Sequence, residues 1–366
     1  MTARTRAESS RIAAVASQFQ LGGEFLSATP YGSGHINDTW CVVCRRAGTQ
    51  VRAILQRINR NIFTNPAALM DNVERVTRHL AEQAAGEPDA GRRALTLIPA
   101  HHGRFWHVDA EGRPWRAYRF VEGASSFDAI ESTDQAFQAA RAFGRFQRQL
   151  ASLPAPRLNE ILPDFHHTPN RFAAFEHALA ADTAGRAHLA QPEIEFALAR
   201  RSLTRVLLDA TLPERVTHND AKLNNVLLDD ATGEGLCVID LDTVMPGLAP
   251  YDFGDMVRTA TSAAEEDERD LSKVTMQFPM FEALARGYLS EAGGFLTKEE
   301  KQILAFSGKL ITFEIGIRFL ADFLAGDTYF KVHREGHNLD RCRTQFKLVE
   351  SIERQEDQMT RLIESL

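Results

Sequence analysis

The sequence predicts an α+β protein of two lobes, a β-rich N-terminal lobe over residues 1–122 and a mainly helical C-terminal lobe over residues 123–366. Short runs with strand-like alternation, separated by glycines, fill the first third of the chain. Beyond Gly123, apolar residues recur at helical spacing. At 366 residues the chain is long enough to build both lobes.

The N-terminal lobe begins with an expected helix over residues 11–19. The turn residues Gly48, Gly103 and Gly112 separate the strand-like runs that follow. We expect strands at 39–44, 51–58, 95–98, 105–108 and 115–121, with one helix at 66–85 between them.

In the C-terminal lobe the spacing predicts helices at 133–150, 169–181, 192–208, 267–291 and 297–324, and a last helix from about residue 338. That last helix carries an apolar stripe from Leu339 to Ile352. The stripe favours packing onto its own lobe over a dimer interface, and the oligomeric state stays open.

A polar loop between two apolar strands carries the chemistry. His218, Asp220 and Asn225 form the pattern H-x-D-x-x-x-x-N, and Asp240 ends the next strand. This spacing is typical of the catalytic loop of a protein-kinase-like fold, which positions groups for phosphoryl transfer. We expect Asp220 to orient the attacking hydroxyl, Asn225 and Asp240 to hold Mg²⁺, and His218 to brace the loop. Asp252 and Asp255, at the start of a further helix, are interpreted as a cap or brace.

A glycine pair upstream of the first expected strand is the candidate phosphate loop. Gly32 and Gly34 allow backbone amides to approach phosphate oxygens closely. A Walker-type loop is absent from the sequence. A protein-kinase-like fold has a cation on its third strand, and Arg57 on the strand expected at 51–58 is the candidate. A register shift of one residue would instead turn Gln56 toward the phosphates.

Two further sets of residues complete the expected nucleotide site. Asp71 and Glu74, on the helix at 66–85, are candidate partners for the strand cation. Arg119 and Val121 lie where the two lobes join, and their main-chain groups are candidates for adenine binding.

Together these residues resemble the aminoglycoside phosphotransferase and choline kinase superfamily, with the closest likeness to N-acetylhexosamine 1-kinases. The likeness rests on strings such as Gly34–Thr39, Ile54–Phe63, His218–Asn225, Val238–Gly247, Tyr251–Asp255, Arg318–Leu320 and Gly326–Phe330.

The resemblance implies an ATP- and Mg²⁺-dependent kinase that phosphorylates the C1 hydroxyl of N-acetylglucosamine or N-acetylgalactosamine. It implies Asp220 as the catalytic base and Asp242 as a second metal ligand or a supporting carboxylate. Arg318, Tyr329 and His35 then contact the sugar, as Asp220 also does.

Composition narrows the classes of partner. Lys plus Arg number 42 and Asp plus Glu 49, and the net charge of −7 argues against nucleic-acid binding. No apolar stretch approaches the roughly 18 residues of a membrane span, and the N-terminus lacks a signal sequence, so we expect a cytoplasmic protein. Cys41 and Cys44 sit in a strand that turns them to opposite faces, which disfavours a zinc site.

Two other functions stay open. A kinase for an amino alcohol or an aminoglycoside would need an acidic acceptor pocket, and the carboxylates over 265–270 could contribute to one. The second alternative is a pseudokinase scaffold that binds nucleotide without catalysis. Such a protein has no chemical need for Asp220, Asn225 and Asp240 together.

Overall fold

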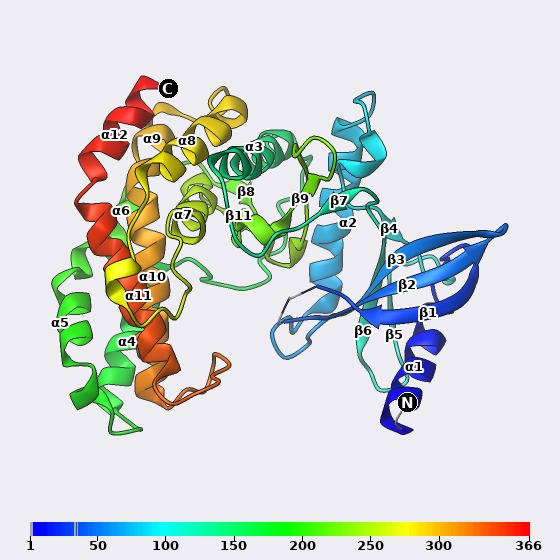
Figure 1. Cartoon of the computed structure of the whole chain (residues 1–366), viewed down its shortest axis with the longest axis horizontal. Coiled ribbons are helices and arrows are strands. Elements are labelled where there is room, and N and C mark those ends of the chain that lie inside the picture. The colour runs from blue at the N-terminus through cyan, green and yellow to red at the C-terminus, as the bar shows by residue number, and fades with distance from the viewer. Residues whose placement is uncertain (1–2, 33, 35) are drawn as a thin grey trace.

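The structure, a computed structural model, describes residues 3–32, 34 and 36–366, and it confirms the two-lobed α+β fold (Figure 1). Within this part of the chain six antiparallel strands form the N-terminal sheet, in the order β1-β2-β3-β6-β4 with β5 paired to β6. These strands are β1 (Glu24–Pro30), β2 (Asp38–Arg46), β3 (Thr49–Arg57), β4 (Leu97–Ile98), β5 (Trp106–Val108) and β6 (Pro114–Arg119). Helices α1 (Ala3–Ala16) and α2 (Pro66–Gln83) and the short η1 (Ala90–Arg92) complete this lobe.

Strand β1 was not expected from the sequence. It lies at the sheet edge, and none of its residues is fully buried, so it lacks the apolar alternation of a half-buried strand. Its register against β2 also shifts between Phe25 and Ser27.

The C-terminal lobe is mainly helical and carries two small sheets, β10-β9-β7 and β11-β8. Its strands are β7 (Ala124–Ser125), β8 (Arg215–Thr217), β9 (Val226–Asp229), β10 (Gly235–Val238) and β11 (Met245–Gly247). Its helices are α3 (Thr133–Leu150), α4 (Thr168–Ala181), α5 (Gln191–Ala199), α6 (Val206–Asp209), α7 (Ala249–Ala260), α8 (Phe278–Ala292), α9 (Lys298–Gln302), α10 (Leu304–Ala325), α11 (His337–Glu353) and α12 (Glu356–Ser365). Short η segments cover Ala187–Leu189, Arg201–Arg205, Leu223–Asn225, Leu241–Thr243 and Leu271–Lys273.

Two expected helices are shorter than the sequence suggested. The helix expected at 192–208 ends as α5 at Ala199 and continues as a 3₁₀ segment, where the Thr204 hydroxyl bonds the Arg201 carbonyl at 2.8 Å. The helix expected at 267–291 begins only with α8 at Phe278, because Pro279 fits the first turn of a helix and not its interior.

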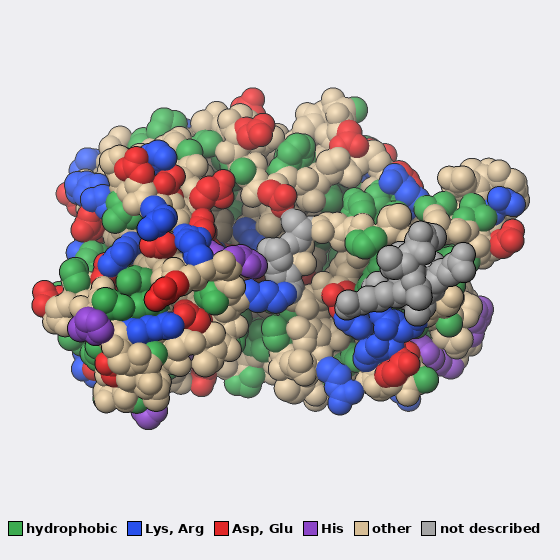
Figure 2. All heavy atoms as spheres, turned by 60° about the horizontal axis from the view of Figure 1, so that its bottom comes forward, with side chains coloured by type: hydrophobic (Ala, Val, Ile, Leu, Met, Phe, Trp, Pro, Cys, Tyr) green, Lys and Arg blue, Asp and Glu red, His purple; other side chains and the backbone are tan. Residues whose placement is uncertain are grey.

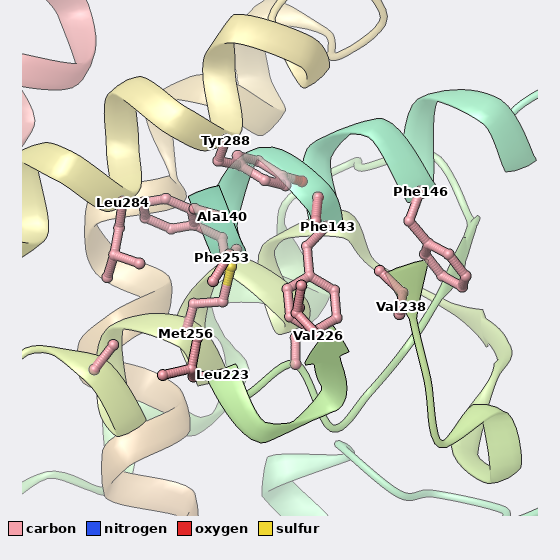
Figure 3. Packing of buried hydrophobic residues seen from close by; sticks show 14 of the residues in the cluster. Ala140, Phe143, Phe146, Leu223, Val226, Val238, Phe253, Met256, Leu284 and Tyr288 are labelled. Atoms are coloured by element: carbon pink, nitrogen blue, oxygen red, sulfur yellow. The ribbon is translucent and has the colours of Figure 1, made fainter. Parts of the chain in front are cut away.

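The main core lies directly beneath the loop that joins β8 to β9 (Figure 3). Phe143 of α3 lies there beside Val226 of β9, Phe146 lies beside Val238 of β10, and Leu223 belongs to the same cluster. Close packing of this kind holds a loop to one backbone path, since few voids remain into which it could shift.

Helix α2 connects the lobes. Val73 and Val76 are fully buried in the same apolar cluster as α3, α7 and α8, and the helix runs between the sheet and the C-terminal lobe (Figure 1). The Asn72 amide donates to the Val244 carbonyl at 3.0 Å. The expected division at residue 122 falls between β6 and β7, and separate domains on either side of it remain a prediction.

Among the described residues, no helix is both long enough and apolar enough to cross a bilayer.

Candidate active site

Asp220 lies in the loop over residues 218–225, which joins β8 to β9. Its carboxylate is 3.0 Å from the Lys222 ammonium and accepts a 3.0 Å hydrogen bond from the Asn225 amide. Burial would raise the pKa of Asp220, but the charges of Lys222 and His218 outweigh it and lower the pKa below its ordinary value. Asp220 is therefore ionised at neutral pH, and the 29% of its side chain that is exposed can meet a hydroxyl.

The 218–225 loop is braced from below by Asp252 of α7. Its two oxygens accept hydrogen bonds from the backbone N–H groups of His218 and Asn219, at 2.8 and 2.7 Å. The Gln147 amide donates to it as well, at 2.6 Å. His218 in turn donates to the Ile239 carbonyl at 2.9 Å. These bonds confirm the bracing roles expected for His218 and Asp252.

A buried pair of opposite charge supports the same loop from a second side. His166 lies 2.8 Å from Glu314 of α10 through one ring nitrogen and 3.1 Å from the Asn219 carbonyl through the other. Burial opposes the charge of His166, yet the Glu314 carboxylate raises the pKa of the imidazole above its ordinary value. A charged imidazole can donate from both nitrogens, as this geometry requires.

A cavity of about 210 Å³ opens between the lobes. It brings together most of the residues predicted to bind nucleotide and metal, namely Gly32, Gly34, Arg119, Val121, Asn225 and Asp240. The side-chain oxygen of Asn224, also in its wall, is buried without a hydrogen-bond partner among the described residues. We call this space the interlobe cavity.

Asp240 and Asn225 fit a magnesium ion in the interlobe cavity. Burial raises the pKa of Asp240 to about 6, the carboxylates of Asp242 and Asp220 add to the effect, and the charges of Lys222 and Arg116 oppose it. The Asn225 amide nitrogen bonds Asp220, which leaves its amide oxygen for a cation. Carboxylate and amide oxygens are ligands that Mg²⁺ accepts. No group of three or more His, Cys, Asp and Glu in the described part of the chain forms a metal cluster, so phosphate oxygens would supply further ligands.

The glycines of the expected phosphate loop lie at the cavity mouth. Gly32 has a φ of +80°, a backbone conformation that residues with a Cβ atom rarely adopt, and this accounts for the glycine at that position. At Gly34 an added methyl group would meet no atom of the described residues within 4 Å. A bare backbone at this position allows close approach of a phosphate.

The placement expected for Arg57 is corrected by the structure. Arg57 pairs with Asp38 and stands 6.0 Å over the Trp115 ring, and it is not part of the wall of the interlobe cavity. Neighbouring strand residues face opposite sides of a sheet, so Gln56 faces the cavity instead. The cation beside Gln56 belongs to β6, the strand that neighbours β3 in the sheet. Arg116 of β6 donates to the Gln56 oxygen at 2.9 and 2.5 Å.

The suggested partners of the strand cation also lie elsewhere. On α2, Asp71 is 3.9 Å from Arg75 and Glu74 pairs with Arg78, one turn along the same helix. The carboxylate that pairs with Arg116 is Asp242, and both side chains are almost fully buried.

Asp242 therefore has a structural task. One of its oxygens pairs with Arg116, and the other accepts a 2.6 Å hydrogen bond from the Asn37 amide. Both oxygens are engaged by the N-terminal lobe, which favours the supporting role over that of a second metal ligand.

The predicted sugar-binding residues gather at another cavity. Arg318 and Tyr329 line a space of about 400 Å³ between α4 and α10, which we call the α4–α10 cavity. The walls of the interlobe cavity do not include them. Arg318 is one helical turn from Glu314, whose partner His166 contacts the 218–225 loop. His35 lies outside the described residues.

Sequence reasoning missed three basic residues. Lys222 lies inside the recognised loop, so its position in Asp-x-Lys was an available signal. Arg116 and Arg171 carried no local signal, because single arginines on a strand or a helix are usually solvated. Arg171 of α4 lines the α4–α10 cavity beside Arg318.

Comparison with known proteins places this geometry in context. Residues 27–285 match the model of the phosphotransferase enzyme family. The fold is similar to that of a microcompartment-associated aminopropanol kinase, with a TM-score of 0.64 and 18% identity over 96% of this chain and 98% of that one. It is also similar to an aminoglycoside phosphotransferase from Alicyclobacillus acidocaldarius (TM-score 0.63, 13% identity, 96% of each chain). A choline/ethanolamine kinase family protein from Mesorhizobium loti matches with a TM-score of 0.54 and 16% identity, over 98% of this chain and 99% of that one. At these identities the likeness shows a shared fold.

Proposed function

The chain belongs to the phosphotransferase enzyme family, and from that premise we propose that it transfers the γ-phosphoryl group of ATP to the C1 hydroxyl of an N-acetylhexosamine. The observation that carries the proposal is the hydrogen bond between Asn225 and Asp220, at 3.0 Å. It sets a group suited to a metal beside a group suited to a hydroxyl, at the edge of the interlobe cavity.

In the proposed reaction the sugar hydroxyl oxygen attacks the γ-phosphorus. A P–O bond to the sugar forms while the bond to the β,γ-bridging oxygen breaks, and that oxygen leaves with the electron pair as ADP. Asp220 orients the hydroxyl and takes its proton, late along the path because the transition state is loose. Lys222, held 3.0 Å from Asp220, offers positive charge to the transferring group.

The interlobe cavity supports a nucleotide on its other wall. Gly32 and Gly34 approach the phosphates, and the main chains of Arg119 and Val121 meet the adenine. The Arg119 N–H already donates to the Thr96 carbonyl at 2.8 Å, so its carbonyl is the group proposed for the base. Mg²⁺ held by Asn225 and Asp240 would neutralise phosphate charge.

The sugar assignment rests on Arg318 and Tyr329, which share one cavity wall. A guanidinium and a phenol both suit sugar hydroxyls and an acetamide carbonyl. An amino alcohol is the second candidate, because the fold is shared with an aminopropanol kinase and a choline/ethanolamine kinase family protein. The positive charges of Arg171 and Arg318 in the α4–α10 cavity disfavour such a cationic acceptor.

The test is ADP release with ATP and Mg²⁺ across N-acetylglucosamine, N-acetylgalactosamine, glucose, galactose, choline, aminopropanol and kanamycin, with phosphorus NMR of the product. A sugar 1-phosphate from an N-acetylhexosamine supports the proposal. Turnover with the amines alone contradicts the sugar assignment. Bound ATP without turnover on any acceptor would favour a pseudokinase scaffold.

The variant Asp220→Asn tests the base. We expect turnover to fall about 10²- to 10⁴-fold while the dissociation constant for ATP stays nearly unchanged. A fall of less than about tenfold would remove Asp220 from the role of general base.

A further inference from the structure

The α4–α10 cavity has a distinctive lining. Its floor and walls include small side chains such as Ala174, Ala178 and Ala321, which leave open the space of about 400 Å³. Two guanidinium groups, Arg171 from α4 and Arg318 from α10, share it. A cavity with small apolar walls and a few convergent polar groups is the usual form of a small-molecule site.

The two arginines have no carboxylate partner among the residues that the structure describes. Arg171 donates to the Phe165 carbonyl, at 3.2 Å from Nε and 3.0 Å from Nη2. Arg318 lies over two aromatic rings, 5.5 Å from the centre of Phe165 and 5.8 Å from that of Phe330. Burial and the nearby charge of Arg318 both lower the pKa of Arg171, and the carboxylates of Glu314 and Asp164 oppose this shift only in part.

The nearest carboxylates are already occupied. Glu314 pairs with His166 and accepts from the Thr168 hydroxyl at 2.6 Å. Asp322 accepts from the backbone N–H groups of Tyr329 and Phe330, at 2.8 and 2.9 Å, among other donors. Asp322 also lines the cavity, and the charges of Glu314 and Asp164 favour the charged form of Arg171, but none of these carboxylates forms an ion pair with either arginine among the described residues. Both guanidinium groups therefore keep donors for a ligand.

A short series of contacts links Arg171 to the loop that carries Asp220. The Phe165 carbonyl that Arg171 contacts precedes His166, and His166 lies 3.1 Å from the Asn219 carbonyl, next to Asp220. On the face of the molecule shown in Figure 2, basic and acidic side chains are mixed over the C-terminal lobe. Arg171 is thus linked to the 218–225 loop through Phe165 and His166.

We propose that the α4–α10 cavity is an anion subsite and that the acceptor is a sugar bearing a carboxylate, which Arg171 and Arg318 bind while its hydroxyl faces Asp220. The inference rests on the proposed function and narrows its substrate class. Arginine binds a carboxylate through paired, charge-assisted hydrogen bonds, which are stronger than those to a neutral sugar oxygen.

The experiment compares neutral sugars with related sugars that carry a carboxylate. We would measure dissociation constants by calorimetry, without nucleotide, for N-acetylglucosamine against its 3-O-lactyl ether and for galactose against galacturonic acid. At least one carboxylate-bearing sugar should bind about tenfold or more tightly than its neutral parent. Arg171→Gln and Arg318→Gln should each reduce that ratio to below about threefold, and Arg171→Lys should restore part of it.

Arg205→Gln is the matched control, because Arg205 is exposed and pairs with Asp209 on α6, outside this cavity; its ratio should equal that of the wild type. Equal or weaker binding of both carboxylate sugars would overturn the inference. So would a preference that persists in both glutamine variants, or no binding of any of the four sugars. A clear preference without phosphate transfer to any sugar would instead contradict the proposed function alone.

Discussion

Asp242 accepts a 2.6 Å hydrogen bond from the amide of Asn37, and this contact ties the glycine loop of the N-terminal lobe to the C-terminal lobe. The second oxygen of Asp242 pairs with Arg116, which in turn holds Gln56. Asp242 stands two residues after Asp240, the candidate metal ligand. The positions of the glycine loop, the buried cation and the metal site are thus set by one short segment.

Substitution of Asn37 and substitution of Asp242 should lower the stability of the protein by different amounts. Asn37→Ala deletes two partly buried hydrogen bonds, one donated to Asp242 and one accepted from the Asn59 N–H, so we expect about 2 kcal/mol of lost stability and a KM for ATP raised several-fold. Asp242→Asn leaves Arg116 buried without its counter-charge, and should lower the free energy of unfolding by about 3–5 kcal/mol. Urea unfolding and ATP titration measure both. Equal losses of stability in the two variants would contradict the assignment.

The register of β3 makes a second prediction. Gln56 accepts from Arg116 beside the interlobe cavity, so Gln56→Ala should raise the KM for ATP by about tenfold. Arg57→Ala removes only a partly exposed pair with Asp38, and should change KM by less than about twofold and stability by less than about 1 kcal/mol. If Arg57→Ala raised the KM for ATP more than Gln56→Ala did, Arg57 of β3 would be the cation that serves the phosphate site.

Substitution of Gly34 should affect ATP binding without lowering the stability of the fold. A methyl group at Gly34 meets no atom of the described residues within 4 Å, so Gly34→Ala should leave the melting temperature unchanged or slightly raised while weakening ATP binding. Gly32→Ala is the comparison, because a φ of +80° strains any other residue by about 1–2 kcal/mol. Thermal unfolding with and without ATP distinguishes the two. Unchanged ATP affinity in Gly34→Ala would remove Gly34 from the proposed phosphate site.

The His166–Glu314 pair predicts a pH dependence of stability. Glu314 raises the pKa of His166 despite its burial, and the neighbouring Asp255 acts in the same direction. This contribution is complete below the ordinary histidine pKa of 6.5 and is lost as the pH rises through the raised value. Burial would raise the pKa of Glu314, but His166 and, to a lesser extent, Arg318 lower it, so the Glu314 contribution is present above 4.5 and is lost in acid.

Glu314→Gln tests this pair. Breaking a fully buried ion pair should cost about 3–5 kcal/mol near pH 6, and the gap to the wild type should narrow toward pH 9. Unfolding in urea across this range measures the gap, and Thr77→Ala is the control, because the Thr77 hydroxyl bonds the Val73 carbonyl on α2 and contacts neither member of the pair. A constant gap from pH 6 to 9 would show that His166 does not carry the charge.

Local signals in the sequence identified some elements well. Helix α3 begins and ends where the spacing predicts, because Ser132 caps it through the Gln135 N–H at 3.2 Å and a continuous apolar stripe follows. The catalytic loop was equally accessible, since His218, Asp220 and Asn225 lie within one short string. Their chemistry depends on spacing along the chain, which a sequence shows directly.

Pairing across the fold was less accessible. Gln56 and Arg116 lie 60 residues apart, and only the register of β3 against β6 sets them together. A shift of one residue would have favoured Arg57, and single-sequence patterns do not determine such a register when both candidates are polar. Arg171 was missed for a similar reason, because its significance depends on a second arginine from another helix.

The place of α2 in the core limits how this protein can be recombined with its relatives. Its apolar face, with Leu69, Val73 and Val76, belongs to the cluster that also holds α3 and α7. A chimera joined at residue 122 would set a foreign α2 against those helices, with mismatched volumes in the largest core of the molecule. Exchange of the N-terminal sheet between relatives should therefore succeed when α2 is kept with the C-terminal lobe it was selected to fit.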